Sequence, residues 1–408
     1  MERPNKAYRA VGRRWLLASM PALAALVPAA ARAQPASLSI GYLRLLDRHP
    51  VISLRDQQPK DDGLAGALLG IADNNATGRF IDQQFSLVDK GLRGTDDPLA
   101  ALQALVAQGV RLVLTDTPAE TVLKLAGAAP AGVTLFNIAA PDDRLRQQDC
   151  RANLIHVVPS RAMFADALAQ YLVWKKWTRW VLASGSHPQD LALAEDYRRA
   201  ARRFGAKIVG ELRYTDTGGS RETDSGIAET QLQIPRFTQE IPEYDVLVAA
   251  DENQIFAGYL PYRTWQARPV AGSAGLMPVT WDAASESWAG TQMQSRFERA
   301  ARRAMRPLDM QAWTAVRMVG EAASRSKSVD PASVMAYMRG PDFAVAAYKG
   351  RRLSLRDWDL QLRQPILLSD GHSVISVSPQ PGFLHQVTEL DTLGFDRPET
   401  QCKLAAGQ

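Results

Sequence analysis

The chain has 408 residues, with 48 basic and 43 acidic side chains, two cysteines and a formal net charge of +5 at pH 7. Six of the basic residues and one of the acidic residues fall within the first 33 positions, which leaves 42 of each in the remainder. A remainder without net charge lacks the basic footprint of proteins that bind nucleic acid or anionic lipid, so we expect neither as a partner.

The first 33 residues have the layout of an export signal. A basic region containing Arg13-Arg14 precedes an apolar region at 15–27, and Ala31-Arg32-Ala33 is a small-residue cleavage site. The apolar run is shorter than the ~20 residues that span a bilayer. We therefore expect export with cleavage near Ala33, by either the general or the twin-arginine route. No later stretch is apolar enough to span, so a soluble exported protein is expected.

Short apolar strands then alternate with helical segments. In the first half, strands are predicted at 38–45, 85–88, 111–114 and 133–138, and helices at 63–75, 99–107 and 119–126. The pattern restarts with strands at 154–158, 180–183, 207–212, 245–249 and 269–272, helices at 162–174 and 191–204, and a polar loop at 218–225. This alternation is typical of βαβ units with a parallel sheet. It predicts an α/β protein of two doubly wound parallel-sheet lobes.

The last third begins with helical sequence. Helices are predicted at 284–305 and 310–325, followed by a short helix that opens at Pro331 with Asp330 as its cap. Two strands are predicted at 364–368 and 373–378.

The two cysteines, Cys150 and Cys402, both follow the predicted signal. An oxidising compartment favours a disulfide between them, and the chain-entropy model gives such a long loop roughly 5 kcal/mol of stabilisation. The alternative is a pair of buried free thiols.

Ligands of open α/β sheets collect at the carboxyl ends of the strands, where helix N-termini offer free N–H groups. The polar residues that follow predicted strands are therefore candidate ligand contacts. Those selected are Thr115, Asp116, Thr117, Asp142, Ser184, Ser186 and Asp251, while Glu252 and Asn253 also follow a predicted strand. Four of them also suit a structural role. Thr117, Asp116 and Asp251 could cap the next helix, and Asp142 could form a turn.

The common catalytic motifs are absent from the sequence. It has no nucleophile elbow, phosphate-binding loop, dinucleotide-binding loop, HExxH or CxxC motif, and its five histidines lack metal-ligand spacing. We therefore predict a protein that is not an enzyme and has no cofactor, and we assign no residue as a metal ligand. Trp281, which follows Met277-Pro278 where the chain returns between lobes, is a candidate aromatic residue of the cleft.

Three segments carry a family resemblance: GALLGIADNNATG after the first strand, NLIHVVPSRAMFADALAQYL, and DMQAWTAVRMVGEAASRSKSVDPASVMAYMRG. They resemble type I periplasmic binding proteins, in particular the branched-chain amino-acid receptors of ABC transporters. This resemblance implies a periplasmic receptor whose interlobe cleft closes on a small polar ligand and which docks on a permease and ATPase complex. It also implies three crossings, with one lobe at 36–157 plus 277–345 and the other at 158–276 plus 346–402.

Further segments, among them QDCRANLIHVVPSRAM, VAGSAGLMPVTW and DLQLRQPILL, resemble a subfamily associated with alcohol oxidation that depends on pyrroloquinoline quinone. This resemblance implies a periplasmic quinoprotein dehydrogenase as a possible partner. It leaves two alternatives to transport: a sensor or accessory protein of the dehydrogenase system, and a receptor for calcium or a lanthanide.

The family pattern places ligand contacts at Thr115 to Thr117 and at Ala139-Ala140, where the receptors hold an α-carboxylate. Asp116 departs from that pattern. Two like charges at ~4 Å repel by roughly 4 kcal/mol at an effective dielectric near 20, or about three decades of affinity. We therefore expect a neutral ligand with hydroxyl groups, or a cation.

Overall fold

The computed structural model describes residues 35–46, 57–216 and 224–404, with the side chains of 224–227 excepted. The predicted export signal and most of the predicted loop at 218–225 lie outside these residues. No helix within the described ranges is both long and apolar enough to cross a membrane.

The first sheet has five parallel strands in the order β2-β1-β3-β4-β5. They are β1 (Ala36–Leu45), β2 (Gln83–Leu92), β3 (Leu112–Asp116), β4 (Thr134–Asn137) and β5 (Leu154–His156). The connecting helices are α1 (Leu64–Gly78), α2 (Pro98–Ala107) and α3 (Ala119–Ala128). All of these elements were predicted from the sequence pattern, with bounds that differ by a few residues.

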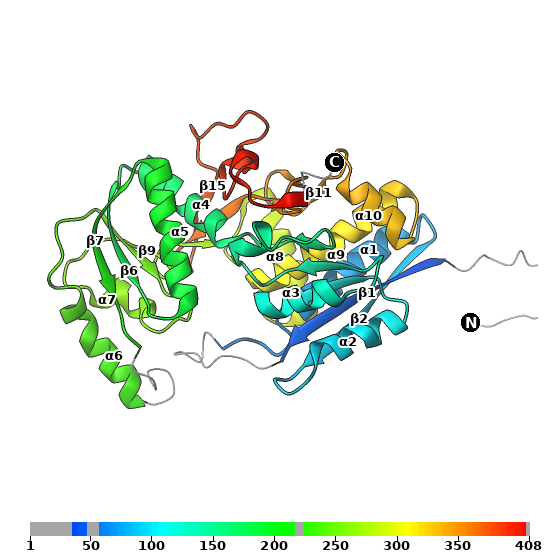
Figure 1. Ribbon diagram of the computed structural model, residues 1–408, viewed down its shortest axis with the longest axis horizontal. Coiled ribbons are helices and arrows are strands. Elements are labelled where there is room, and N and C mark those ends of the chain that lie inside the picture. The colour runs from blue at the N-terminus through cyan, green and yellow to red at the C-terminus, as the bar shows by residue number, and fades with distance from the viewer. Residues whose placement is uncertain (1–34, 47–56, 217–223, 405–408) are drawn as a thin grey trace, which may run out of the picture. The chain divides into compact units, whose positions relative to one another are not determined.

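Alternation of side chains along β1 gives the first sheet two covered faces. Leu38, Ile40 and Tyr42 pack into the core that contains α1 together with the late helices α8 (Gly290–Ala301), α9 (Pro307–Ser326) and α10 (Pro331–Arg339). Leu43 packs on the opposite face with α2 and α3. Figure 1 shows α9 beside α1, although more than 200 residues separate them in the chain.

The second sheet has four parallel strands in the order β7-β6-β8-β9. They are β6 (Arg179–Ser184), β7 (Lys207–Arg213), β8 (Val246–Ala250) and β9 (Val270–Gly272). One face packs on α4 (Arg161–Trp174) and α5 (Pro188–Phe204), and the other on α6 (Asp224–Phe237) and α7 (Leu260–Arg263). Two parallel sheets covered by helices confirm the predicted α/β fold class.

Two small antiparallel sheets complete the chain. One consists of β10 (Met277–Val279), β14 (Ile366–Ser369) and β15 (Val374–Ser378), and Figure 1 shows β15 beside α4. The other consists of β11 (Val345–Ala346), β12 (Arg352–Leu355) and β13 (Leu362–Arg363), whose Leu353 and Leu362 belong to the core of the first sheet. The lobe boundaries expected from the sequence stay a prediction.

The helix predicted at 284–305 is shorter than expected, because three residues leave the helical region. Trp288 and Ala289 have φ of 52° and 65°, and Arg302 has φ of 59°, so α8 begins at Gly290 and ends at Ala301. Asp330 caps α10 as predicted, since its side chain accepts a hydrogen bond from the backbone N–H of Ser333.

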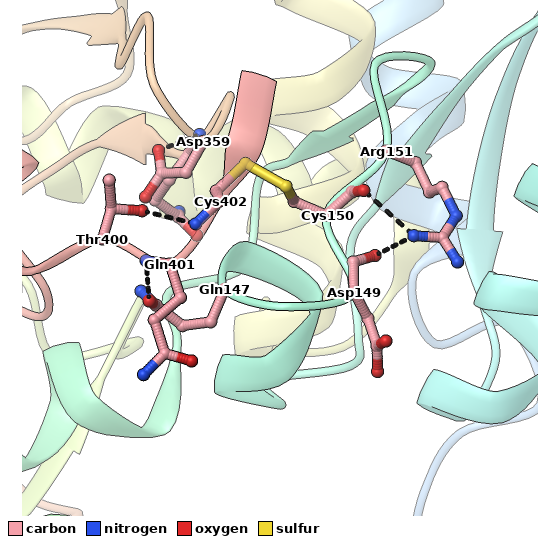
Figure 2. The surroundings of a disulfide bond; sticks show 9 residues. Gln147, Asp149, Cys150, Arg151, Asp359, Thr400, Gln401 and Cys402 are labelled. Carbon is pink, nitrogen blue, oxygen red and sulfur yellow. Dashed lines mark hydrogen bonds between the residues drawn. A yellow bond between two sulfur atoms is a disulfide. The ribbon is translucent and has the colours of Figure 1, made fainter. Parts of the chain in front are cut away.

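Cys150 and Cys402 form the predicted disulfide, with Cα atoms 5.6 Å apart and 252 positions between them in sequence. Figure 2 shows that the tail is also held by hydrogen bonds: the Gln401 N–H donates to Gln147 Oε1 over 2.7 Å, and the Cys402 N–H donates to Thr400 Oγ1. The disulfide and the bond to Gln147 fix the C-terminal tail against the segment that precedes β5, whereas the bond to Thr400 lies within the tail.

Candidate functional site

A cavity of about 730 Å³ lies beyond the carboxyl ends of β3, β4 and β8. We call it the strand-end cavity. Five of the predicted ligand contacts line it, namely Asp116, Thr117, Ala139, Ala140 and Asp142. Residues from the elements of the second sheet complete the wall, including Pro188, Gln189, Glu252 and Asn253. The position follows the general rule for open α/β sheets.

The end of β3 brings Asp116 and Thr117 to the cavity. Asp116 is the last residue of the strand and pairs in register with Arg44 of β1. Thr117 is only 3% exposed, and its Oγ1 has no hydrogen-bond partner among the described residues. Pro118 is the N-cap of α3, and no side chain caps this helix. Thr117 therefore does not cap α3, which was the structural alternative for this residue.

The segment after β4 presents Ala139 and Ala140 to the cavity, but their N–H groups are already used. Both donate to Oδ1 of Asn137, over 3.3 Å from Ala139 and 2.9 Å from Ala140. The Asn137 amide is held in turn by the Ala140 carbonyl and by Nδ1 of His156, which lies on β5. Burial, together with the charge of Arg146, lowers the pKa of His156 well below its usual value.

Both arginines of the cavity wall are ion-paired. Arg144 contacts Glu120 at 2.6 Å and Asp149 at 3.3 Å. Arg161 contacts Glu252 at 2.5 Å and Asp142 at 3.2 Å. Four carboxylates line the cavity, Asp116, Glu120, Asp142 and Glu252, so they outnumber the two arginines.

Four of the predicted polar contacts do not line the cavity, and neither does Trp281, which is described in the next paragraph. Thr115 is fully buried within β3, where its hydroxyl donates to the Phe136 carbonyl. Ser184 is buried at the end of β6, and Ser186 Oγ accepts a hydrogen bond from the Asp216 N–H. Asp251 is also fully buried, and its carboxylate accepts hydrogen bonds from the backbone N–H groups of residues 255, 256 and 257. Asp251 thus has a structural role, because it holds the loop that follows β8, but it does not cap a helix as the sequence alternative proposed: the N-cap of the next short helix, Ala257–Tyr259, is Phe256.

The prediction that Trp281 lies in the cleft is corrected by its burial. Its side chain is 1% exposed and belongs to the core of the first sheet, where Nε1 donates to Oε1 of Gln294. A large aromatic side chain contributes most to stability when it is buried in this way, with its N–H paired.

Sequence reasoning missed Arg161, and it noted Glu252 and Asn253 as strand-end residues without selecting them as ligand contacts. Arg161 and Glu252 are 91 positions apart, and Asn253 pairs with Asp190 over a separation of 63, so no local pattern relates the partners. Within the described ranges, no three His, Cys, Asp or Glu side chains are grouped so as to hold a metal ion.

The profile of a family described as periplasmic binding protein matches residues 59–224, which is less than half of the chain. No curated protein sequence matches the chain. Among solved structures, a periplasmic binding protein of Burkholderia mallei has a TM-score of 0.65 at 15% identity, covering 90% of this chain and 99% of its own.

Two further solved structures are similar. A branched-chain amino-acid ABC transporter periplasmic ligand-binding protein of Burkholderia xenovorans has a TM-score of 0.65 at 16% identity, over 83% of this chain and 95% of its own. An ABC transporter solute-binding protein of R. palustris, in complex with benzoate, has a TM-score of 0.62 at 12% identity, over 90% and 99%. The chain has the two-lobe α/β fold of type I periplasmic binding proteins.

Proposed function

We propose that this protein is the periplasmic substrate-binding component of an ABC transporter, is not an enzyme, and holds a small polar ligand in the strand-end cavity. The fold, the family profile and the functions for which the similar structures are named support this proposal. In such receptors the two lobes close around the ligand by a hinge motion, and the closed form is presented to the permease.

The observation that carries the proposal is the hydroxyl of Thr117. It is a buried polar group in a cavity wall, and Oγ1 has no hydrogen-bond partner among the described residues. A buried hydroxyl without a partner costs about 1–3 kcal/mol. A ligand that forms a hydrogen bond with Thr117 would remove this cost, so the group favours an occupied cavity over an empty one.

The charges of the wall favour an uncharged hydroxylated ligand or a cation. Free cationic groups would favour a carboxylate ligand, but Arg144 and Arg161 are paired with carboxylates, and the four acidic side chains of the wall would repel it. The N–H groups of Ala139 and Ala140 donate to Asn137. We therefore propose a ligand class different from the amino acids and benzoate that the similar structures are named for. A metal ligand is not proposed, because the described residues contain no suitable group of ligands.

We also propose that the receptor serves a quinoprotein alcohol oxidation system, and this part of the proposal rests on the sequence resemblance. It directs the choice of test ligands to alcohols, polyols, aldehydes and small amines. The same resemblance supports the alternative that the protein acts as an accessory factor of a periplasmic dehydrogenase.

A thermal-shift screen of the protein without its signal tests the proposal, with amino acids, alcohols, aldehydes, amines, quinone cofactor, calcium and lanthanides as candidates. We expect an uncharged or cationic compound to raise the melting temperature. Thr117→Val should abolish that shift and Thr117→Ser should retain it, because serine keeps the hydroxyl.

Transport is the wrong interpretation if no small compound raises the melting temperature while a quinoprotein dehydrogenase is retained in a pull-down. The ligand class is wrong if an amino acid or aromatic acid binds and Thr117→Val weakens that binding.

A further inference from the structure

A second cavity, of about 640 Å³, lies among α1, α8, α9 and the β11–β12 hairpin. We call it the helix-side cavity. None of its lining residues lines the strand-end cavity. The helix-side cavity is therefore separate from the proposed transport site, and its side chains have no role in that site.

Three aromatic side chains line the helix-side cavity: Trp288, Trp313 and Tyr348. The rings of Trp313 and Tyr348 have centroids 5.6 Å apart and are tilted by 51°. The Trp288 ring lies against Gly350, where an added Cβ would come within 2.4 Å of Cε2 of the indole. Trp288 is nevertheless 49% exposed, so a large apolar surface faces the cavity mouth and solvent.

A hydrogen-bond network holds two of these rings in place. The Asp73 carboxylate accepts hydrogen bonds from Trp313 Nε1, over 2.9 Å, and from Arg296. Arg296 Nη1 also donates to the Tyr348 hydroxyl over 3.1 Å. Asp73 thus neutralises one arginine of the cavity and fixes two of its aromatic side chains. A wall built in this way is preorganised for a flat ligand.

Two cations of the wall have no carboxylate within ion-pair distance in the part of the chain that the structure describes. Arg317 Nη1 donates to the side-chain carbonyl of Asn74, and Lys349 Nζ donates to Oε1 of Gln364. Lys349 is only 2% exposed, and burial lowers its pKa to about 7. Burial also lowers the pKa of Arg317. Arg317 is a partly buried cation without a carboxylate partner, and an anion bound beside it would also favour the protonated form of Lys349, so the two side chains are suited to an anionic ligand.

The backbone at the aromatic wall is in an unfavourable conformation. Trp288 has φ of 52° and Tyr348 has φ of 55°, values that cost bulky residues about 1–3 kcal/mol each. Such conformations persist where the surrounding structure holds them and often occur at ligand sites. Both residues present their rings to the same cavity, which is an observation independent of its charge.

We propose that the helix-side cavity is a second binding site, which takes a small planar aromatic carboxylate. The ring would lie against Trp288, Trp313 and Tyr348, and the carboxylate would pair with Arg317 and Lys349. Arginine suits this role because its planar fork binds a carboxylate through two hydrogen bonds. The inference goes beyond transport and does not depend on the ligand of the strand-end cavity.

Calorimetric titration with isophthalate, a planar aromatic dicarboxylate, tests the proposal on the whole protein without its signal. We expect saturable binding, weakened about tenfold to a hundredfold by Arg317→Gln, because a charge-assisted hydrogen bond is lost. Trp288→Ala should also weaken binding, and its partial exposure makes it the variant that keeps the fold intact. Arg325→Gln is the matched control, since Arg325 is an exposed arginine of α9 paired with Glu321 and does not line the cavity.

Two analogues separate the parts of the proposal. Dimethyl isophthalate keeps the ring and loses the charges, whereas cyclohexane-1,3-dicarboxylate keeps the charges and loses the planar ring. Both should bind at least about tenfold more weakly than isophthalate. Equal binding of either analogue, unchanged affinity in Arg317→Gln and Trp288→Ala, or no saturable binding would overturn the proposal. Thr117→Val should leave the affinity for isophthalate unchanged; a loss in that variant would place the ligand in the strand-end cavity and overturn the second site.

Discussion

Arg161 binds both carboxylate oxygens of Glu252, with Nε 2.5 Å from Oε2 and Nη2 2.7 Å from Oε1. Its third nitrogen, Nη1, lies 3.2 Å from Oδ1 of Asp142. Arg161 is the first residue of α4, Asp142 follows β4 and Glu252 follows β8. One guanidinium thus joins three chain segments at the strand-end cavity. Burial lowers the pKa of Arg161, but the hydrogen bond and charge of Glu252, assisted by Asp142, raise it further, so the net pKa lies above its usual value.

Replacement of this arginine by methionine should destabilise the fold. Arg161→Met leaves two carboxylates facing each other without their cation. Breaking a fully buried pair costs about 3–5 kcal/mol, and this is an upper bound here because Glu252 is partly exposed. Urea unfolding should show a clear loss of free energy. Arg179→Met, which removes the exposed pair with Glu243, should cost less than about 1 kcal/mol. Equal losses in both variants would contradict a structural role for Arg161.

The sequence predicted the two sheets because strands that helices cover on both faces are continuous apolar runs, and these runs alternate with helical segments along the chain. Asp116 and Thr117, which the sequence puts at the end of a strand, line the strand-end cavity, and their role as ligand contacts stays a prediction. The pairing of Arg161 with Glu252 could not be predicted, because it depends on how the segments after β4 and β8 approach each other in three dimensions. Trp281 was misplaced for a related reason: an aromatic residue near a crossing is equally compatible with a cleft and with the core.

Asp196 gives a prediction for the pH dependence of stability. Burial raises its pKa to about 9, and the charge and hydrogen bond of Asp143 contribute, while Arg199 and Arg161 oppose the shift. The folded protein therefore binds a proton that an unfolded aspartate, with a pKa of about 4, releases. Stability supplied by this proton is complete below about pH 4 and is lost as the pH rises towards about 9.

Asp196→Asn should remove this pH dependence, because the amide donates a hydrogen bond to Asp143 at every pH. Melting curves at about pH 7 and about pH 9 should show a smaller decrease in the variant than in the native protein. This range avoids Asp166, whose pKa is raised by burial to about 6. Glu195→Gln is the control, since Glu195 is a neighbouring exposed residue paired with Arg198 and Arg202. An unchanged slope in Asp196→Asn would mean that Asp196 does not keep its proton in the folded protein.

Asp251 and Thr117 should behave in opposite ways when they are replaced. Asp251→Ala leaves the N–H groups of residues 255–257 without their acceptor, so we expect a loss of about 1–3 kcal/mol for each N–H that stays unpaired. Thr117→Val removes a hydroxyl that has no partner in the described structure, so its free energy of unfolding should be unchanged or slightly higher. Urea unfolding measures both. A large loss of stability in Thr117→Val would show that its hydroxyl supports the fold, and would remove the basis for a ligand contact there.

The disulfide should stabilise the chain mainly by restricting its unfolded state. Cys150 and Cys402 are separated by 252 positions, and the chain-entropy model assigns a loop of this length roughly 5 kcal/mol. The double variant Cys150→Ser, Cys402→Ser should therefore unfold at a lower urea concentration than the oxidised protein. Reduction of the native protein should give a similar midpoint, which makes it the matched control for the substitutions.

Thiol titration checks that the bond exists in the exported protein. Denatured protein should expose free thiols only after reduction. Because the disulfide lies at the C-terminal tail and neither cysteine lines the strand-end cavity, the affinity for a ligand of that cavity should be unchanged when the bond is absent. Loss of affinity without loss of stability would show that the tail acts on the cavity, and would contradict a purely stabilising role for the bond.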